Sequence, residues 1–407
     1  MKIEGNIIVG QSGGPTAAIN SSLAGVICGG RELCTGKVYG MISGVEGLLS
    51  EKIADLNQYI KNDKDIELLK RTPSSYLGSC RFKLPEPVEG NEIYEKLFEI
   101  FRKYDIKGFF YIGGNDSMDT VKKLSDYDKF KNSGICFMGV PKTIDNDLVC
   151  TDHTPGFGSA AKFVATVTKE LVRDSLVYDL ASVTVVEIMG RDAGWLTGAS
   201  ALSKGDDCEG PAMVLLPEVE FDYEYVKNRV SELIKTKKSI VITVSEGVRT
   251  KDGKYVCEMG SEKGTDAFGH TMLTGTAQTI ASMLKKDLGI KTRAVELSTL
   301  QRCASHIASL TDITESFAVG EAAVKAAAEG HSGEMALLKR ISDEPYICIT
   351  DTADVHGVAN LAKDVPRSMI NEKGDYVTEE FVRYVKPLIA GEVSQLYVNG
   401  LPQHIKM

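Results

Sequence analysis

The sequence lacks the features that mark secreted, membrane-spanning and nucleic-acid-binding proteins. Its nine cysteines show no paired short spacing, so neither a zinc site nor a disulfide framework is indicated, and reduced thiols in a cytoplasmic protein are the better interpretation. Basic residues are not in excess: 47 Lys and Arg against 56 Asp and Glu give a net charge of −9. This balance argues against nucleic acid or an anionic membrane as the main partner. No apolar stretch approaches the ~20 residues needed to cross a bilayer.

The chain also lacks fixed-period repeats, low-complexity tracts and long linkers. A strand pattern begins at Asn6, which leaves no room for a signal peptide. The length of 407 residues predicts two domains of ordinary size. Short runs rich in valine and isoleucine alternate with longer helical patterns, as in parallel sheets covered by helices. The predicted fold class is therefore α/β, with two Rossmann-like domains, mainly parallel sheets and a cleft between the domains.

The periodicity of apolar residues sets the expected elements. The predicted strands are Asn6–Gly10, Gly36–Met41, Gly108–Ile112, Ile135–Val140, Ser182–Met189, Ala212–Leu216, Ser239–Ser245 and Thr292–Leu297. The predicted helices are Thr16–Cys28, Glu92–Tyr104, Asp116–Ser125, Gly158–Leu176, Tyr223–Thr236, Thr271–Leu288 and Ala318–Ala328.

A glycine-rich turn follows the first predicted strand. Its sequence is Gly10-Gln11-Ser12-Gly13-Gly14-Pro15-Thr16, and we expect a helix to open at Thr16. Backbone amides at such a turn, with the helix dipole behind them, form an anion site. The turn has neither the Gly-Lys-Ser/Thr of a Walker motif nor the dinucleotide spacing. A plain structural turn is therefore the alternative.

Two more glycine turns follow later strands. Gly113-Gly114 precedes Asp116, whose carboxylate is either part of a ligand site or a simple N-cap for the next helix. Met189-Gly190-Arg191 offers a guanidinium suited to bidentate phosphate binding, or a surface salt bridge. The carboxyl ends of parallel strands are where ligands bind in open α/β sheets. Three such turns together favour the binding interpretation.

A carboxylate pair follows the strand that ends at Val140. Thr143, Asp145 and Asp147 have period-two spacing, so in an extended chain they face one side together. Asp145 can act as a general base towards a hydroxyl, Asp147 can orient a substrate or bind Mg²⁺ through water, and Lys142 places a positive charge where phosphate charge develops. The alternative is an Asx-rich loop that caps the helix after Gly158.

These segments together resemble the phosphofructokinase family. The family's motifs occur here in order, as Gly10–Pro15, Gly113–Asp116, Thr143–Asp147, Met189–Arg191, Glu246-Gly247 and Gln301-Arg302, and Gly78–Phe82 resembles its nucleotide-side arginine segment. The resemblance runs from about residue 5 to about residue 335 of this sequence. It implies phosphoryl transfer to the 1-hydroxyl of fructose 6-phosphate, with Mg²⁺ as cofactor, in a cytoplasmic homo-oligomer (dimer or tetramer). The active site is expected in the cleft between the domains.

Two residues make the chain more similar to the pyrophosphate-dependent branch. ATP-dependent members usually have glycine at the positions of Asp116 and Lys142. A carboxylate at Asp116 would occupy the space and charge of the ATP α-phosphate. For two negative charges ~4 Å apart at an effective dielectric of ~20, the repulsion is about 4 kcal/mol, which lowers the binding constant nearly a thousandfold. Lys142 would compensate the charge of a bare diphosphate.

The resemblance also implies roles for individual residues. Asp145 would be the base, with Lys142, Asp116, Thr143 and Asp147 as further catalytic residues. The diphosphate would lie on Gly13, Gly14, Gly113 and Gly114, with Asn115 as the metal ligand. The sugar phosphate would be held by the following set: Thr143, Ile144, Asp145, Met189, Gly190, Arg191, Glu246, Arg293 (from a neighbouring subunit), Thr299 and Arg302.

The expected domains follow from the same comparison. Residues 1–154 would form the diphosphate-binding domain, completed by about 300–345, and residues 155–299 the sugar-phosphate-binding domain. Residues 346–407 form a C-terminal extension with no assigned role. Ser182 and Thr299 stand where the family usually has an arginine and a histidine or tyrosine. They leave sedoheptulose 7-phosphate open as the acceptor, beside an ATP-dependent phosphofructokinase and a non-catalytic sugar-phosphate sensor as further alternatives.

Overall fold

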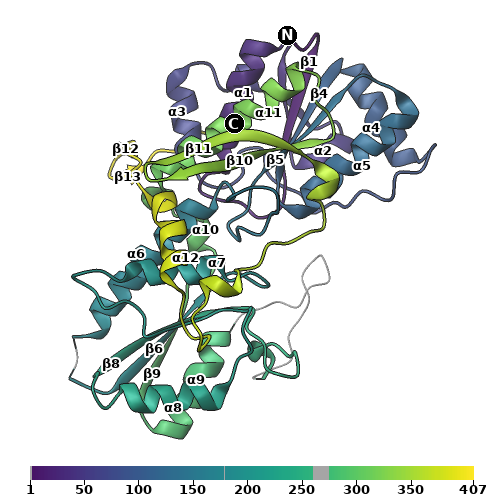
Figure 1. Ribbon diagram of the computed structural model, residues 1–407. Coiled ribbons are helices and arrows are strands. Elements are labelled where there is room, and N and C mark those ends of the chain that lie inside the picture. The colour runs from purple at the N-terminus through teal and green to yellow at the C-terminus, as the bar shows by residue number, and fades with distance from the viewer. Residues whose placement is uncertain (1, 178, 260–274) are drawn as a thin grey trace. The chain divides into compact units, whose positions relative to one another are not determined.

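The computed structural model describes residues 2–177, 179–259 and 275–407. The chain divides into two compact units. The first unit comprises Met1–Ser159, Arg302–Ala362 and Ala390–Met407, and the second comprises Ala160–Gln301 and Lys363–Ile389. Residues 346–407 therefore contribute to both units. Figure 1 labels the elements of each unit.

The first unit is built on a seven-stranded sheet in the order β11-β10-β5-β4-β1-β2-β3. Its central strands pair in parallel, while β3 and β11 are antiparallel at the two edges. The strands are β1 (Asn6–Gln11), β2 (Val38–Met41), β3 (Ile53–Asp55), β4 (Ile106–Gly113), β5 (Cys136–Pro141), β10 (Glu334–Asp343) and β11 (Tyr346–Asp354). A separate two-stranded ribbon joins β12 (Tyr397–Val398) to β13 (Leu401–Pro402).

Helices cover both faces of this sheet. Because side chains alternate along a strand, Ile7 and Val9 enter one hydrophobic cluster while Ile8, between them, enters another. The first cluster packs against α1 (Ile19–Leu33), α3 (Asp63–Arg71) and α11 (Leu310–Ala328). The second packs against α2 (Gly44–Leu49), α4 (Glu92–Lys103) and α5 (Asn115–Lys131). The sheet is thus buried on both faces, and its strand ends are left to carry polar residues.

The second unit has a four-stranded, all-parallel sheet in the order β7-β8-β6-β9. The strands are β6 (Ser182–Ile188), β7 (Met213–Leu215), β8 (Ser239–Ser245) and β9 (Lys291–Glu296). One face packs against α8 (Tyr223–Leu233) and α9 (Thr276–Leu288). Trp195, which opens α7 (Trp195–Gly198), stacks on Phe381 of α12 (Glu379–Val385) with ring centroids 5.9 Å apart.

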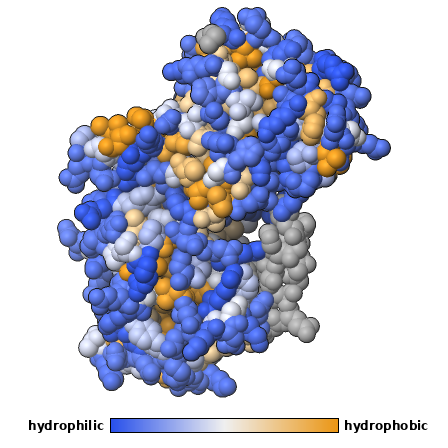
Figure 2. Space-filling view, turned by 45° about the vertical axis from the view of Figure 1, so that its right-hand side comes forward, coloured by the Kyte–Doolittle hydropathy of each residue, from blue (hydrophilic) through white to orange (hydrophobic). Residues whose placement is uncertain are grey.

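Two helices cross the boundary between the units in sequence: α6 (Phe157–Ser175) and α10 (Leu300–Cys303). The 3₁₀ helices are η1 (Leu56–Gln58), η2 (Ala199–Ser203), η3 (Val256–Met259), η4 (Ser305–Ile307), η5 (Val355–Gly357), η6 (Arg367–Met369) and η7 (Lys386–Ile389). The described part of the chain contains no helix that is long and apolar enough to cross a bilayer. The face drawn in Figure 2 is mainly hydrophilic, with smaller hydrophobic patches.

The predicted α/β class with mainly parallel sheets is confirmed. All eight predicted strands are present, each within two residues of its expected ends. The predicted helix at Thr16 begins instead at Ile19, and the helix predicted from Ala318 begins at Leu310. Residues 271–274, the expected start of α9, lie outside the described residues. The β10–β11 hairpin was not predicted, because its exposed edge strand carries no clear burial pattern.

Candidate active site

Three strand ends of the first unit carry the predicted diphosphate residues. Strands β1, β4 and β5 are parallel neighbours, so their carboxyl ends lie at one edge of the sheet. The Ser12 amide donates to the Ile112 carbonyl oxygen at 2.9 Å, and the Lys142 amide donates to that of Gly113 at 2.9 Å. These backbone bonds bring Gly13-Gly14, Gly113-Gly114 and Lys142 together.

The Gly13-Gly14 turn is approached closely by two cations. A Cβ on Gly13 would lie 3.3 Å from Lys142 Nζ, and one on Gly14 would lie 3.2 Å from Arg302 Nη1. Gly13 also has φ +74°, which favours glycine. The turn therefore presents backbone to two positive side chains, which suits an anion.

The helix expected to open at Thr16 begins three residues later, at Ile19. The Thr16 carbonyl, which would accept from Asn20 in such a helix, accepts from the Ser74 amide at 3.2 Å instead. The Thr16 hydroxyl accepts from the Ala18 amide at 3.2 Å. These bonds hold residues 16–18 in a bend. The N-terminus of α1 is therefore further along the chain from the Gly13-Gly14 turn than the sequence predicted, and the cations that approach this turn are Lys142 and Arg302.

Lys142 is the buried cation at this edge. It is 3% exposed, and its Nζ donates to the Gly14 carbonyl oxygen at 2.6 Å. Burial lowers the pKa of Lys142 to about 8; the charge of Arg302 acts in the same direction, and Asp145 and Asp147 oppose it. Two carboxylates and two cations thus interact within one small region of the first unit.

The period-two argument assumed that the loop carrying the carboxylates is an extended strand. In the structure this loop is bent. Asn146 has φ +54°, and the Thr143 hydroxyl accepts from the Asp145 amide at 3.1 Å, which bends the chain. Exposure nevertheless alternates: Thr143, Asp145 and Asp147 are half-buried, and the residues between them are buried. All three predicted residues are therefore partly accessible, and that they face one side together stays a prediction.

Buried polar residues hold this loop in place. Asn146 Oδ1 accepts from the Thr154 amide at 3.0 Å, and the Thr154 hydroxyl donates to the Thr143 carbonyl at 2.8 Å. At the start of α6, the amides of Gly156 and Ser159 donate to the carboxylate of Asp312 at 2.8 and 2.9 Å. The alternative interpretation was that the Asx-rich loop caps the helix that follows it. In the structure Asp312, and not that loop, accepts hydrogen bonds from the amides at the start of α6.

Asp116 is not an N-cap. The cap position of α5 is Gly114, and Asp116 is the second residue of the helix. Its half-exposed carboxylate pairs with Lys83 Nζ at 3.2 Å. Sequence reasoning missed Lys83; its only signal is its place directly after the Gly78–Phe82 segment.

Asn115, predicted as the metal ligand, has an unusual amide. Its Oδ1 atom is buried and accepts no hydrogen bond in the structure. An unsatisfied buried acceptor costs about 1–3 kcal/mol. A bound ligand or cation at this atom would remove that cost.

The second unit gathers another set of predicted residues at the carboxyl ends of β6 and β8. The Gly190 amide donates to Glu246 Oε1 at 3.3 Å, and the Ser245 hydroxyl donates to the Gly190 carbonyl. A Cβ on Gly247 would lie 1.7 Å from the Arg191 carbonyl oxygen, so only glycine fits there. Met189 joins this cluster, because its amide donates to Gln301 Oε1 at 3.3 Å.

The remaining predicted sugar-phosphate residues are Thr143, Ile144, Asp145, Arg293, Thr299 and Arg302. Arg293 is in the middle of the edge strand β9, opposite Thr184, and its exposed guanidinium pairs with Asp174 at 3.3 Å. Thr299 is exposed just before α10. Arg302 belongs to the first unit, beside Gly14. Ile144, also assigned to this set, is buried in the first unit.

A family model and two similar known proteins all indicate the same family for this chain. The family model described as Phosphofructokinase matches residues 6–327. A protein of Halomonas elongata named pyrophosphate–fructose 6-phosphate 1-phosphotransferase is 44% identical over 406 residues, covering 99% of this chain and 96% of the relative. A protein of the same name from Methylococcus capsulatus is 40% identical over 406 residues, again with 99% and 96% coverage.

Solved structures give the same result. The pyrophosphate-dependent phosphofructokinase of Nitrosospira multiformis superposes with a TM-score of 0.89 at 38% identity, covering 98% of this chain and 96% of that one. The enzyme of the same description from Marinobacter aquaeolei has a TM-score of 0.87 at 37% identity, with 99% and 96% coverage. On its motifs, its fold and these near full-length similarities, the chain belongs to the phosphofructokinase family.

Proposed function

We propose that this protein is a pyrophosphate-dependent 6-phosphofructokinase. It transfers a phosphoryl group from diphosphate to the 1-hydroxyl of fructose 6-phosphate, giving fructose 1,6-bisphosphate and phosphate, and the reaction is reversible. The observation that carries the donor assignment is the presence of two residues: a buried Lys142 bonded to the Gly13-Gly14 turn, and the carboxylate of Asp116 directly after the Gly113-Gly114 turn. The names of the full-length relatives support it.

The donor site lies at the carboxyl edge of the first sheet. Amides of the two glycine turns and the charges of Lys142 and Arg302 would hold diphosphate. In a buried site these charges act in a lower dielectric than water and are stronger for it. Asp116 would repel the α-phosphate of ATP, and Lys83 holds its carboxylate in place.

Asp145 is the proposed base. It takes the proton of the sugar 1-hydroxyl, the freed oxygen forms a bond to one phosphorus, and the bridging P–O bond breaks, with phosphate leaving. Lys142 and Arg302 stabilise the charge on the transferred group. Thr143 bends the loop so that Asp145 stays accessible, and Asp147 positions the reacting groups.

Mg²⁺ is the proposed cofactor, and the chain's residues fit it. Family members generally use a divalent metal ion. The unpaired Oδ1 of Asn115 is a neutral oxygen donor, and Asp145 and Asp147 supply carboxylates at the same sheet edge; Mg²⁺ prefers oxygen ligands. When bound with diphosphate, the ion would neutralise part of its charge.

The sugar phosphate is proposed to lie on Met189, Gly190, Arg191 and Glu246, with Thr299 as a further proposed contact. The Glu246 carboxylate fixes the Gly190 amide, and Gly247 leaves room for the Arg191 backbone.

The exposed position of Arg293 on the edge strand β9 suits donation to a neighbouring subunit, so a homo-oligomer (dimer or tetramer) is part of the proposal. All nine cysteines are free thiols, which supports a cytoplasmic location.

A matrix of two donors and two acceptors tests the proposal. Initial rates are measured with diphosphate or ATP, against fructose 6-phosphate or sedoheptulose 7-phosphate, with Mg²⁺ present. We expect turnover with diphosphate and little with ATP, and the higher kcat/KM with fructose 6-phosphate. Preference for sedoheptulose 7-phosphate would instead fit Ser182 and Thr299 at positions where the family usually has larger polar groups. Preference for ATP would refute the donor assignment.

A further inference from the structure

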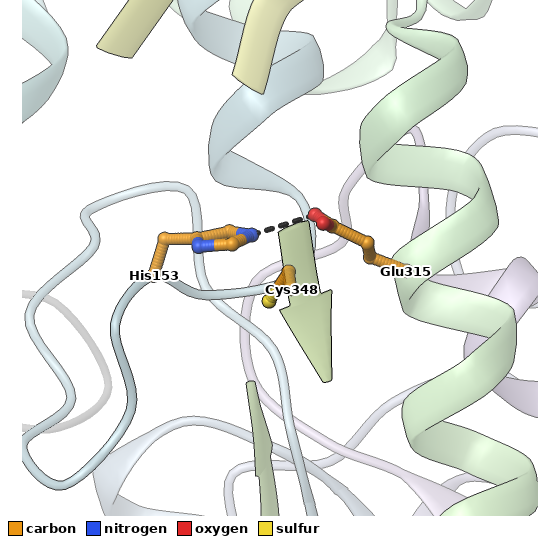
Figure 3. A group of neighbouring side chains, drawn as sticks. All are labelled: His153, Glu315 and Cys348. Atoms are coloured by element: carbon orange, nitrogen blue, oxygen red, sulfur yellow. Dashed lines mark hydrogen bonds and ion pairs between the residues drawn. The ribbon is translucent and has the colours of Figure 1, made fainter. Parts of the chain in front are cut away.

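A second cluster of chemically active side chains lies in the first unit, among residues that the proposed reaction does not use. Within the described residues, His153, Glu315 and Cys348 each place a ligand atom within 4.8 Å of the other two. Figure 3 shows the three side chains converging from the loop before α6, from α11 and from β11. The elements that meet here are far apart in the sequence.

Neighbouring groups orient two of these side chains. His153 Nδ1 bonds Asp152 Oδ1 at 2.8 Å, while Nε2 faces Glu315 Oε2 at 2.7 Å. The other oxygen of Glu315 accepts from the Tyr346 hydroxyl at 2.7 Å. A carboxylate on the far nitrogen of a histidine is the arrangement that orients metal-ligating imidazoles in proteins.

A guanidinium holds the carboxylate that orients His153. Arg340 lies 3.1 Å from Asp152 Oδ1 and 3.1 Å from Asp343 Oδ1. Asp152 therefore bonds His153 Nδ1 on one side and Arg340 on the other, which fixes the orientation of the imidazole towards Glu315.

We propose that His153 Nε2, a Glu315 carboxylate oxygen and Cys348 Sγ form a binding site for Zn²⁺, with water as the fourth ligand. Imidazole, carboxylate and thiolate are the ligands that Zn²⁺ takes, and thiolate selects against Mg²⁺ and Ca²⁺. Two ligands of one tetrahedral Zn²⁺ lie ~3.3 Å apart when each bond is ~2.0 Å. The 2.7 Å between His153 and Glu315 therefore opens by about half an ångström on binding.

The bound ion would connect three parts of the first unit. Cys348 lies on the β10–β11 hairpin, Glu315 on α11, and His153 directly precedes Thr154, whose bonds hold the loop of Asp145 and Asp147. Zn²⁺ would therefore stabilise the hairpin and that loop together. A site with a single cysteine has no Cys-Cys spacing, which explains why the sequence alone gave no sign of it.

Metal binding to the reduced, chelator-stripped full chain tests the proposal, with excess Mg²⁺ present to occupy sites that prefer oxygen ligands. We expect native mass spectrometry to find one tightly held Zn²⁺ per chain. Co²⁺ in its place should give a near-ultraviolet thiolate-to-metal charge-transfer band. Cys348→Ser and His153→Gln should lose the band, and Asp152→Asn should weaken Zn²⁺ binding by about 10–100-fold.

Two matched variants serve as controls. His356 also lies between two carboxylates, Asp354 and Asp126, and Cys136 is another half-buried thiol of the first unit. His356→Gln and Cys136→Ser should bind Zn²⁺ and Co²⁺ as the wild type does. Thermal unfolding in chelator establishes that each variant folds. Absence of the band in the wild-type protein, or its persistence in Cys348→Ser, would overturn the proposal and leave a hydrogen-bonded cluster only.

Discussion

The ammonium group of Lys142 lies 2.6 Å from the carbonyl oxygen of Gly14, and this bond joins the end of β5 to the turn that follows β1. The buried lysine is thereby held at the proposed diphosphate site before any ligand binds. Its charge costs free energy in the empty site, because burial opposes it. A dianionic or more highly charged ligand would offset that cost.

Replacing Lys142 with methionine keeps the chain length and removes the charge. We expect diphosphate turnover to fall by at least ~10²-fold, because the lysine stabilises charge that develops on the transferred group. Steady-state kinetics measure the effect, with Lys107→Met, at an exposed lysine paired with Asp105, as the control. Unchanged turnover in Lys142→Met would remove this residue from the mechanism.

The alkaline pH dependence of kcat/KM for diphosphate should report on the same group, because kcat/KM follows the titration of the free enzyme. The pKa of Lys142 is lowered to about 8, so kcat/KM should decline as pH rises through about 8. In Lys142→Arg the remaining activity should lose this decline, because the guanidinium stays charged. For stability the sign is opposite: between about 8 and the ordinary value of 10.5 the unfolded chain binds more protons, so this residue's contribution rises with pH. A decline that persists unchanged in the arginine variant would assign it to another group.

Asp145→Ser should lower kcat by at least ~10²-fold with a modest change in KM, because a base acts mainly in the transition state. Arg191→Ala should show the reverse and raise the sugar-phosphate KM most, since it removes a charged phosphate contact. The two variants serve as controls for each other in one set of kinetic measurements. Normal turnover with weak sugar binding in Asp145→Ser would make Asp145 a binding residue.

Donor choice should respond to Asp116. Asp116→Gly removes a negative charge and a side chain from the Gly113-Gly114 turn, so measurable ATP turnover should appear, and more of it in combination with Lys142→Gly. Asp119→Gly is the matched control, because Asp119 lies one turn further along α5 and pairs with Lys123. Initial rates with diphosphate and with ATP, measured for both variants, test whether Asp116 selects the donor. If ATP turnover rises equally in Asp119→Gly, Asp116 does not select the donor.

Gly247→Ala should damage the sugar-phosphate cluster without touching the donor site. Its Cβ would lie 1.7 Å from the Arg191 carbonyl oxygen, which must shift to make room. We expect a raised KM for the sugar phosphate and an unchanged KM for diphosphate. Gly205→Ala, where the nearest atom to the new Cβ is Asp207 Oδ1 at an ordinary 3.5 Å, is the control for a glycine replacement in the same unit.

The sequence by itself determined the fold class, the family and the strand ends that carry the motifs. Strand patterns such as Ser239–Ser245 are local, because each buried residue is marked by its own hydrophobicity, and the motifs follow the strands directly. Only the tertiary structure decided that Arg302 lies beside Gly14, that burial lowers the pKa of Lys142, and that Asp312 binds the amides at the start of α6. Only it brought His153, Glu315 and Cys348 together. These relations join residues far apart in the chain, and their energies depend on desolvation and on neighbours that no local pattern records.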